Sequence, residues 1–152
     1  MKNTTLIILI LFLYSCGYSS IYKNQTSQNF KINIIEKKGN SEMNNLIKNE
    51  IKLYSVKNTT NIYNLKIDTD YKKKILTKDS AGIITDYKLS VTSIFRVDLK
   101  GVTKVIELKE TINIKNQSDS FEQNTYEKNI KRSFASSIRE KLISEILNIN
   151  DN

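Results

Sequence analysis

Several residue types are rare or missing, and each absence narrows the functions open to the chain. The 152 residues include no histidine, no proline, no tryptophan, one cysteine and four glycines. Without histidine there is no Ser-His-Asp or Cys-His nucleophile system and no histidine ligand for a metal. A single cysteine permits no intramolecular disulfide, and four glycines provide no glycine-rich phosphate-binding loop. We therefore expect no enzyme and no metal site, although a Ser–Lys dyad stays open in so Ser- and Lys-rich a chain.

The rest of the composition is that of one folded domain. Hydrophobic residues make up 39% and charged residues 26% of the chain, and the formal net charge is +8. A basic surface suits anionic partners, but an excess of Lys, Asn and Ile also indicates a compositional bias. Arginine, the better indicator of bidentate anion recognition, occurs only as Arg96, Arg132 and Arg139. We therefore expect no nucleic-acid partner.

The N-terminus has the features of an export signal. Lys2 precedes an apolar run over residues 6–13, which is far shorter than the ~20 residues that cross a bilayer as a helix. Directly after it, Leu13-Tyr14-Ser15-Cys16 resembles a lipobox, from which only Tyr14 departs. The alternative is a buried free cysteine after an apolar strand, but a cysteine at this N-terminal position would contribute little to core packing. Residues 1–15 are thus predicted to be a lipoprotein signal peptide.

The lipobox resemblance implies that Cys16 is the acylated first residue of the mature chain. Two or more acyl chains anchor a protein stably, whereas one gives only marginal membrane binding. Gly17 rather than aspartate follows the cysteine, which in bacterial lipoproteins implies sorting to the outer membrane. Residues 16–29 are polar without a sustained period, and we interpret them as a lipidated tether to a single domain over residues 30–150.

Four segments of this domain alternate apolar and polar residues with the period of half-buried strands. Residues 79–82 and 100–101 are turn signals between them, and Glu110 is an exception on the apolar face of the fourth. The apolar faces comprise Phe30, Ile32 and Ile34; Tyr63, Leu65, Ile67, Thr69 and Tyr71; Tyr87, Leu89, Val91, Ser93, Phe95, Val97 and Leu99; and Ile106, Leu108, Ile112 and Ile114.

Two further segments have helical spacing. The first follows Gly39 and Asn40, with Ser41 predicted as its N-cap, and its apolar stripe is Met43, Leu46, Ile47, Ile51 and Tyr54. The second begins either at a capping box of Ser120 and Gln123 or at Thr125. It extends to about Ile149 with the stripe Ile130, Phe134, Ala135, Ile138, Leu142, Ile146 and Ile149, opposite a polar side of Lys128, Arg132, Ser136, Arg139 and Glu140.

These elements predict an α+β fold with the order β-α-β-β-β-α. Single-face alternation indicates a sheet with one covered and one solvated face, and two helices with one apolar stripe each would supply the cover. The helix between the first two strands permits a parallel crossover, and the later turns are hairpins. We expect a two-layer sandwich, with two helices packed on one face of a four-stranded mixed sheet.

One pair of acidic residues could in principle do acid–base chemistry. Asp68 and Asp70 lie two apart on a strand, hence on one face and roughly 7 Å apart. Lys66, Lys72 and Lys74 share that polar face, so a solvated charged surface is the better interpretation.

The start of the mature chain resembles a known family. Cys16-Gly17-Tyr18-Ser19-Ser20-Ile21-Tyr22 is similar to the N-terminus of the LPS-assembly lipoproteins of the LptE type, which often reads Cys-Gly-aromatic-x-Pro-Leu-Tyr. Ser20 stands where proline is common, and Ile21 replaces leucine. The predicted element order and a C-terminal helix with the sparse pattern of Arg132, Ala135, Ile138 and Leu142 match that family as well.

The resemblance implies a function that the residues alone do not show. Such proteins lie on the periplasmic side of the outer membrane, plug an LPS-translocon β-barrel of the LptD type and help it deliver lipopolysaccharide. No cofactor is expected. Basic residues near a strand tip contact LPS in this family, and the nearest equivalents here are Lys72, Lys73, Lys74 and Lys78.

Two other classes of protein stay open. One is a periplasmic auxiliary lipoprotein of an ABC-type lipid transport system, which would have an apolar cavity between helices and sheet. The other is an envelope enzyme, for which a polar cleft with perturbed carboxylates would be the sign.

Overall fold

The computed structural model describes residues 30–53, 59, 61–99 and 101–150. The predicted signal peptide, Cys16, the tether before Phe30, and Tyr54 of the first helical stripe lie outside the described residues. The described elements are β1 (Lys31–Gly39), α2 (Ser41–Lys52), β2 (Ile62–Lys78), β3 (Ile84–Leu99), β4 (Val102–Lys115) and α3 (Ser120–Asn150). The order β-α-β-β-β-α is therefore confirmed.

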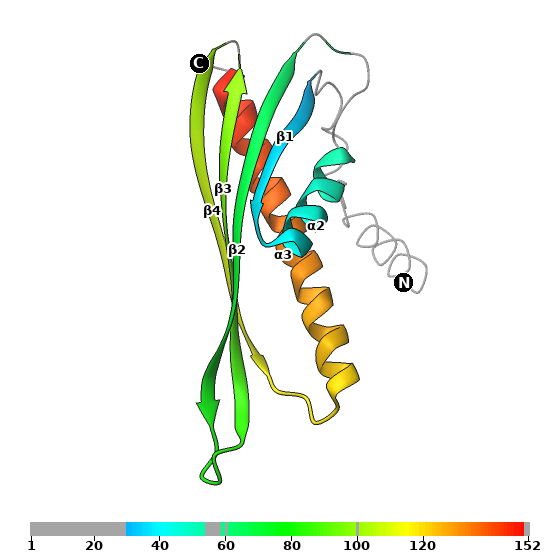
Figure 1. Cartoon of the computed structure of the whole chain (residues 1–152), viewed down its shortest axis with the longest axis vertical. Helices are drawn as coiled ribbons and strands as arrows, with labels where there is room; N and C mark the ends of the chain where they lie inside the picture. The colour runs from blue at the N-terminus through cyan, green and yellow to red at the C-terminus, as the bar shows by residue number, and fades with distance from the viewer. Residues whose placement is uncertain (1–29, 54–58, 60, 100, 151–152) are drawn as a thin grey trace, which may run out of the picture.

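The four strands form one mixed sheet in the order β1-β2-β3-β4. β1 pairs with β2 in parallel, and the β2–β3 and β3–β4 pairs are antiparallel. α2 makes the crossover between the parallel strands, as parallel pairing requires. Both helices lie on the same side of the sheet (Figure 1), which confirms the two-layer α+β sandwich. We call the sheet face turned toward the helices the inner face and the opposite one the outer face.

The inner face carries the apolar residues that the period-two pattern predicts, apart from Leu99, whose side chain lies outside the described part of the structure. The hydrophobic cluster joins both helices to β1–β4. Phe95 on β3 and Ile138 and Leu142 on α3 are fully buried in it. At its centre Thr69 and Ser93 lie opposite each other on β2 and β3, and their hydroxyl oxygens are 3.1 Å apart in a hydrogen bond that satisfies both buried groups.

The predicted N-cap of the first helix is wrong by one residue. Gly39 ends β1 with φ of 77°, a left-handed conformation that turns the chain immediately before the helix. The Asn40 amide donates to the Thr69 carbonyl at 2.6 Å, and the Asn40 side chain accepts from the Met43 amide at 2.9 Å. Asn40 is therefore the N-cap, and Ser41 is the first helical residue.

The start of α3 also differs from both predicted versions. Asp119 Oδ1 accepts a hydrogen bond from the Glu122 amide at 2.9 Å, so Asp119 caps the helix in place of Ser120 or Thr125. The Gln123 side chain reaches back over the loop, where its Oε1 accepts from the Gln117 amide at 2.8 Å. The predicted capping box of Ser120 and Gln123 therefore lies in the first turn of α3, but the Gln123 side chain bonds to Gln117 and not to Ser120.

Two polar residues of the packed layers have specific partners. Glu110, the exception on the apolar face of β4, accepts hydrogen bonds at 2.7 Å from both Ser137 and Lys141 of α3. Arg139, predicted on the polar side of α3, is only 7% exposed. Its guanidinium lies 3.8 Å from Glu50 of α2 and donates to Ser136 at 2.7 Å. The buried surface of α3 is therefore wider than its predicted apolar stripe, because Arg139, which lies next to α2, is buried as well.

β2 and β3 are long enough to leave the layer of helices. They contain 17 and 16 residues, and their hairpin projects beyond α2 and beyond the first turn of α3 (Figure 1). Within the described part of the chain, no helix combines the length and the apolar character needed to cross a membrane.

Candidate anion-binding surface

The outer face of β2, β3 and β4 brings four lysines together. Register places Lys74 opposite Lys88, Lys72 opposite Ser90, and Thr92 opposite Lys109 on β2, β3 and β4. We call Lys72, Lys74, Lys88 and Lys109 the outer-face lysine cluster. Its lysines surround a shallow depression of about 360 Å³, which is completed by Asp70, Ser90, Thr92 and Thr111.

This depression has an excess of positive charge. Asp70 is its only acidic lining residue and forms an ion pair with Lys72. Lys74 and Lys88 lie directly across two strands, where like charges destabilise a sheet. The described residues provide no ion pair for Lys74, Lys88 or Lys109. Ammonium groups with neighbouring hydroxyls are suitable partners for a phosphate, so the chemistry of the depression favours an anion.

A second depression on the outer face has a smaller excess of positive charge. It lies nearer β1 and is lined by Glu36, Lys38, Lys66, Ile67, Asp68 and Arg96. Glu36 is 3.0 Å from the Lys38 ammonium and 3.4 Å from that of Lys66, and the hydrogen bond from Lys38 lowers the pKa of the Glu36 carboxyl. These ion pairs compensate the lysines, so this second depression is a weaker candidate for an anion.

The structure does not bring all four lysines predicted to lie near LPS to one site. Lys72 and Lys74 belong to the outer-face lysine cluster, and Lys78 is exposed at the end of β2. Lys73 faces the helices instead, because neighbouring residues of a strand point to opposite faces. Its ammonium donates to Glu127 of α3 at 2.7 Å and lies 4.3 Å from the centre of the Tyr87 ring.

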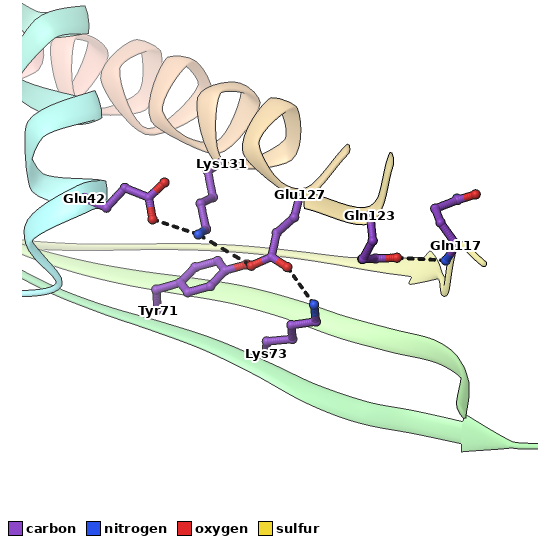
Figure 2. Close-up of polar contacts among 7 residues, drawn as sticks. All are labelled: Glu42, Tyr71, Lys73, Gln117, Gln123, Glu127 and Lys131. Atoms are coloured by element: carbon purple, nitrogen blue, oxygen red, sulfur yellow. Dashed lines mark hydrogen bonds and ion pairs between the residues drawn. The ribbon is translucent and has the colours of Figure 1, made fainter. Parts of the chain in front are cut away.

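Glu127 joins the hairpin to the first turns of α3 (Figure 2). The Tyr71 hydroxyl donates to it at 2.8 Å, and Lys131, 3.5 Å away, forms a second ion pair with Glu42 of α2 at 2.8 Å. Figure 2 shows these groups between the sheet and the two helices. They fix the inner side of the hairpin and thereby the strands that carry the outer-face lysine cluster.

The electrostatics of this contact agree with its geometry. Burial works against ionisation of Glu127, but the hydrogen bonds from Lys73 and Tyr71 and the lysine charges outweigh it, so the pKa of Glu127 is lowered. Burial first, and then the hydrogen bond to Glu127, raise the pKa of Tyr71 well above its ordinary value. Glu127 is thus a carboxylate and Tyr71 a neutral donor at neutral pH.

Sequence reasoning did not find Lys88 and Lys109 as site residues. Both fall at polar positions of alternating strands, but only the register of β3 with β2 and β4 places them beside Lys72 and Lys74. Asp70 lines the same depression, and its ion pair with Lys72 agrees with the predicted solvated charged surface.

Comparison with known proteins shows the fold. The structure is similar to rare lipoprotein B from Shewanella oneidensis, with a TM-score of 0.60 and 11% identity, over 79% of this chain and 98% of that one. It is also similar to a minor lipoprotein from Acinetobacter baumannii, with a TM-score of 0.52 and 13% identity, over 76% and 93% of the two chains. Lipoprotein B from Nitrosomonas europaea gives a TM-score of 0.55 and 9% identity, over 80% and 85%.

The chain therefore has a fold found in bacterial lipoproteins. No protein-family model matches the sequence. No curated protein matches it either.

Proposed function

We propose that this protein is a lipid-anchored lipoprotein at the periplasmic face of the outer membrane, where it plugs an LPS-translocon β-barrel and assists lipopolysaccharide assembly. Three observations support the proposal: the lipobox-like sequence before Cys16, the likeness of its N-terminus to LPS-assembly lipoproteins, and a fold shared with solved lipoproteins.

The outer face is the observation that carries the proposal. From Asp70 to Lys74 on β2, its rows are polar or charged across β2, β3 and β4, and the lumen of a large outer-membrane barrel is likewise polar and wet. The inner surface is filled by the hydrophobic cluster, so the outer face is the natural contact for such a lumen. The outer-face lysine cluster would then lie near LPS phosphates.

Co-purification tests the barrel partner. The tagged mature protein, extracted from outer membranes in mild detergent, is expected to bring down one large β-barrel protein in a stable complex. Recovery with an inner-membrane transporter instead would favour the alternative, an auxiliary lipoprotein of an ABC-type lipid transport system.

Substitution of the lysines tests the LPS contact. Replacing Lys72, Lys74, Lys88 and Lys109 by Gln should leave the barrel complex intact and weaken photo-crosslinking to LPS. The loss should be larger at low salt, because exposed charges are less screened there. The matched control replaces four lysines outside the cluster, Lys31, Lys48, Lys52 and Lys128, by Gln, and so removes the same net charge.

Single substitutions test Lys73 and Lys78, the two predicted LPS-binding lysines that lie outside the outer-face lysine cluster. Lys78→Gln is expected to reduce LPS crosslinking modestly, whereas Lys73→Gln should act mainly on stability because Lys73 is paired with Glu127. Equal crosslinking by the cluster variant and its control would show that the lysines are only a solvated strand face.

A further inference from the structure

The end of the β2–β3 hairpin exposes an apolar surface. Ile75 is 51% exposed, Leu76 46% and Ile83 63%, and we call these three side chains the apolar tip. Ile75 and Leu76 lie near the end of β2 and Ile83 directly before β3, at the end of the hairpin that extends beyond the helices (Figure 1). Three large aliphatic side chains exposed within residues 75–83, around one projecting end, indicate an interaction site rather than scattered exposure.

The turn that carries the apolar tip is well defined. The Asp79 side chain accepts hydrogen bonds from the amides of Ala81 at 2.9 Å and Ile83 at 2.8 Å. The Asp79 amide donates to the Ile83 carbonyl at 2.9 Å, and Gly82 adopts φ of 80°. The hairpin end is therefore preorganised, which lowers the conformational entropy lost when it binds a partner.

Lysines surround the apolar tip. Residues 72–88 contain five lysines and two aspartates, and both aspartates accept local hydrogen bonds, Asp79 as above and Asp86 from the hydroxyls of Thr77 and Thr85. Lys74 adjoins Ile75, and Lys78 follows Leu76 by two residues, so at 3.3 Å per residue their Cα atoms lie within about 10 Å of the apolar tip.

This pattern fits a lipid surface better than a protein. Protein hot spots are enriched in Trp, Tyr and Arg, whereas the exposed side chains here are aliphatic residues and lysines, and Tyr87, opposite Ile75, lies under Lys73. Aliphatic side chains inserted about 5–10 Å below an interface, with lysines at the level of the phosphates, are the arrangement of interfacial membrane anchors.

We propose that the β2–β3 hairpin is a lipid-insertion element, which inserts Ile75, Leu76 and Ile83 among the acyl chains of an anionic bilayer while Lys74, Lys78 and Lys88 contact its phosphates. Lys74 and Lys88 also belong to the outer-face lysine cluster, but the insertion itself does not require the barrel or LPS. It requires only phospholipid of negative charge, so it can fail or succeed while the proposed function stands.

The absence of tryptophan makes a sharp test possible. Ile83→Trp places a single reporter in the apolar tip, and Val102→Trp places one at the start of β4, an exposed position at the opposite end of the sheet. Residues 16–152 are produced without acylation of Cys16, so that the predicted anchor does not itself bind lipid, and the purified protein is mixed with phosphatidylglycerol vesicles or with phosphatidylcholine vesicles. Tryptophan emission and its quenching by brominated acyl chains are recorded for both variants.

We expect the Ile83→Trp emission to move to shorter wavelength and to be quenched with phosphatidylglycerol, with a weaker effect for phosphatidylcholine and none for Val102→Trp. Adding Ile75→Ser and Leu76→Ser to Ile83→Trp should weaken the apparent lipid affinity about tenfold, because most of the inserted apolar surface is lost. Unchanged circular dichroism and thermal melting would confirm that this variant folds.

Three results would overturn the proposal. The first is an Ile83→Trp emission unchanged by anionic vesicles, or quenched no more than that of Val102→Trp. The second is a spectral shift that depends on protein concentration without lipid, which would assign the apolar tip to a second copy of the chain. The third is a shift with detergent-solubilised membrane proteins but not with lipid, which would assign it to a protein partner.

Discussion

At the residue scale, Glu127 shows how a few polar contacts fix the end of the molecule that carries the lysines. The first turns of α3 expose Phe121 and Tyr126 and contribute little to the hydrophobic cluster. The hydrogen bonds from Tyr71 and Lys73 to Glu127 join this part of the helix to the hairpin instead. Because Glu127 is only 13% exposed, loss of its charge or of its partners leaves buried polar groups unsatisfied.

Replacing Glu127 by Gln should lower the free energy of unfolding at pH 7 by about 1–2 kcal/mol. A carboxyl whose pKa is lowered in the folded state stabilises the fold above its unfolded pKa of about 4.3 and loses that contribution as pH falls through the lowered value. The difference between wild type and variant should therefore shrink on going from pH 7 to pH 2. Urea denaturation at both pH values measures it, with the exposed Glu107→Gln as control; a constant difference would contradict the assignment.

Phe95 tests the packed face of β3. The side chain is fully buried in the hydrophobic cluster, so Phe95→Ala should cost about 3–5 kcal/mol of unfolding free energy. Val105→Ala, at an exposed position of β4, should change it by less than about 0.5 kcal/mol. Similar urea midpoints for the two variants would mean that the inner face is assigned wrongly.

At the scale of elements, the passage from β1 to α2 depends on a glycine. A Cβ at Gly39 would lie 2.1 Å from the Thr69 carbonyl oxygen, and the backbone there has φ of +77°. The close approach exists because Asn40 both donates to Thr69 and caps α2. This single junction sets the crossover that makes β1 and β2 parallel.

Gly39→Ala should accordingly destabilise the protein by about 3 kcal/mol or more, from the left-handed backbone and the steric clash together. Gly82→Ala is the matched control: its φ is +80° but a Cβ meets nothing within 4 Å, so only the backbone cost of about 1–2 kcal/mol applies. Thermal melting of both variants gives the comparison. Equal losses would mean that the contact with Thr69 relaxes freely.

At the scale of the whole molecule, the two proposed functional surfaces lie toward the same end of the sheet. The apolar tip and three of the four cluster lysines, Lys72, Lys74 and Lys88, lie on the long β2–β3 hairpin, and Lys109 lies beside them on β4. Lys31 and Ile62, which begin β1 and β2, are paired at the opposite end of the sheet. The chain therefore enters the domain about 50 Å of strand away from the apolar tip, at 3.3 Å per residue. An anchor at the N-terminus would hold one end of the domain and leave the hairpin to reach other partners.

The anchor is tested by mass spectrometry of the purified mature N-terminus, which should show Cys16 with its acyl groups and no signal peptide. Cys16→Ala should abolish acylation and release the domain from membranes, because the tightly held lipid is lost. The released fraction is measured after cell fractionation. An unmodified cysteine in the wild-type protein, or an intact signal, would contradict the predicted lipoprotein.

Much of the fold could be predicted because its signals are local. The alternation from Tyr87 to Val97 specifies which face of β3 is buried, and the spacing of Phe134, Ile138 and Leu142 does the same for α3. The ends of the helices were predicted less well. Asn40 and Ser41 are both able to cap α2, and the contact of Asn40 with the distant Thr69 decided between them. Asp119 and Ser120 are both able to cap α3, and Asp119 does so through the Glu122 amide.

The sequence by itself determined the types and order of the elements and the apolar face of each, since periodicity and turn residues are local features of the sequence. Only the tertiary structure decided which lysines lie together. Strand register places Lys88 and Lys109 beside Lys72 and Lys74, and the pleat of β2 places Lys73 on the other face. Register is a relation between segments distant in sequence, set by the packing of the whole sheet, so no local pattern contains it.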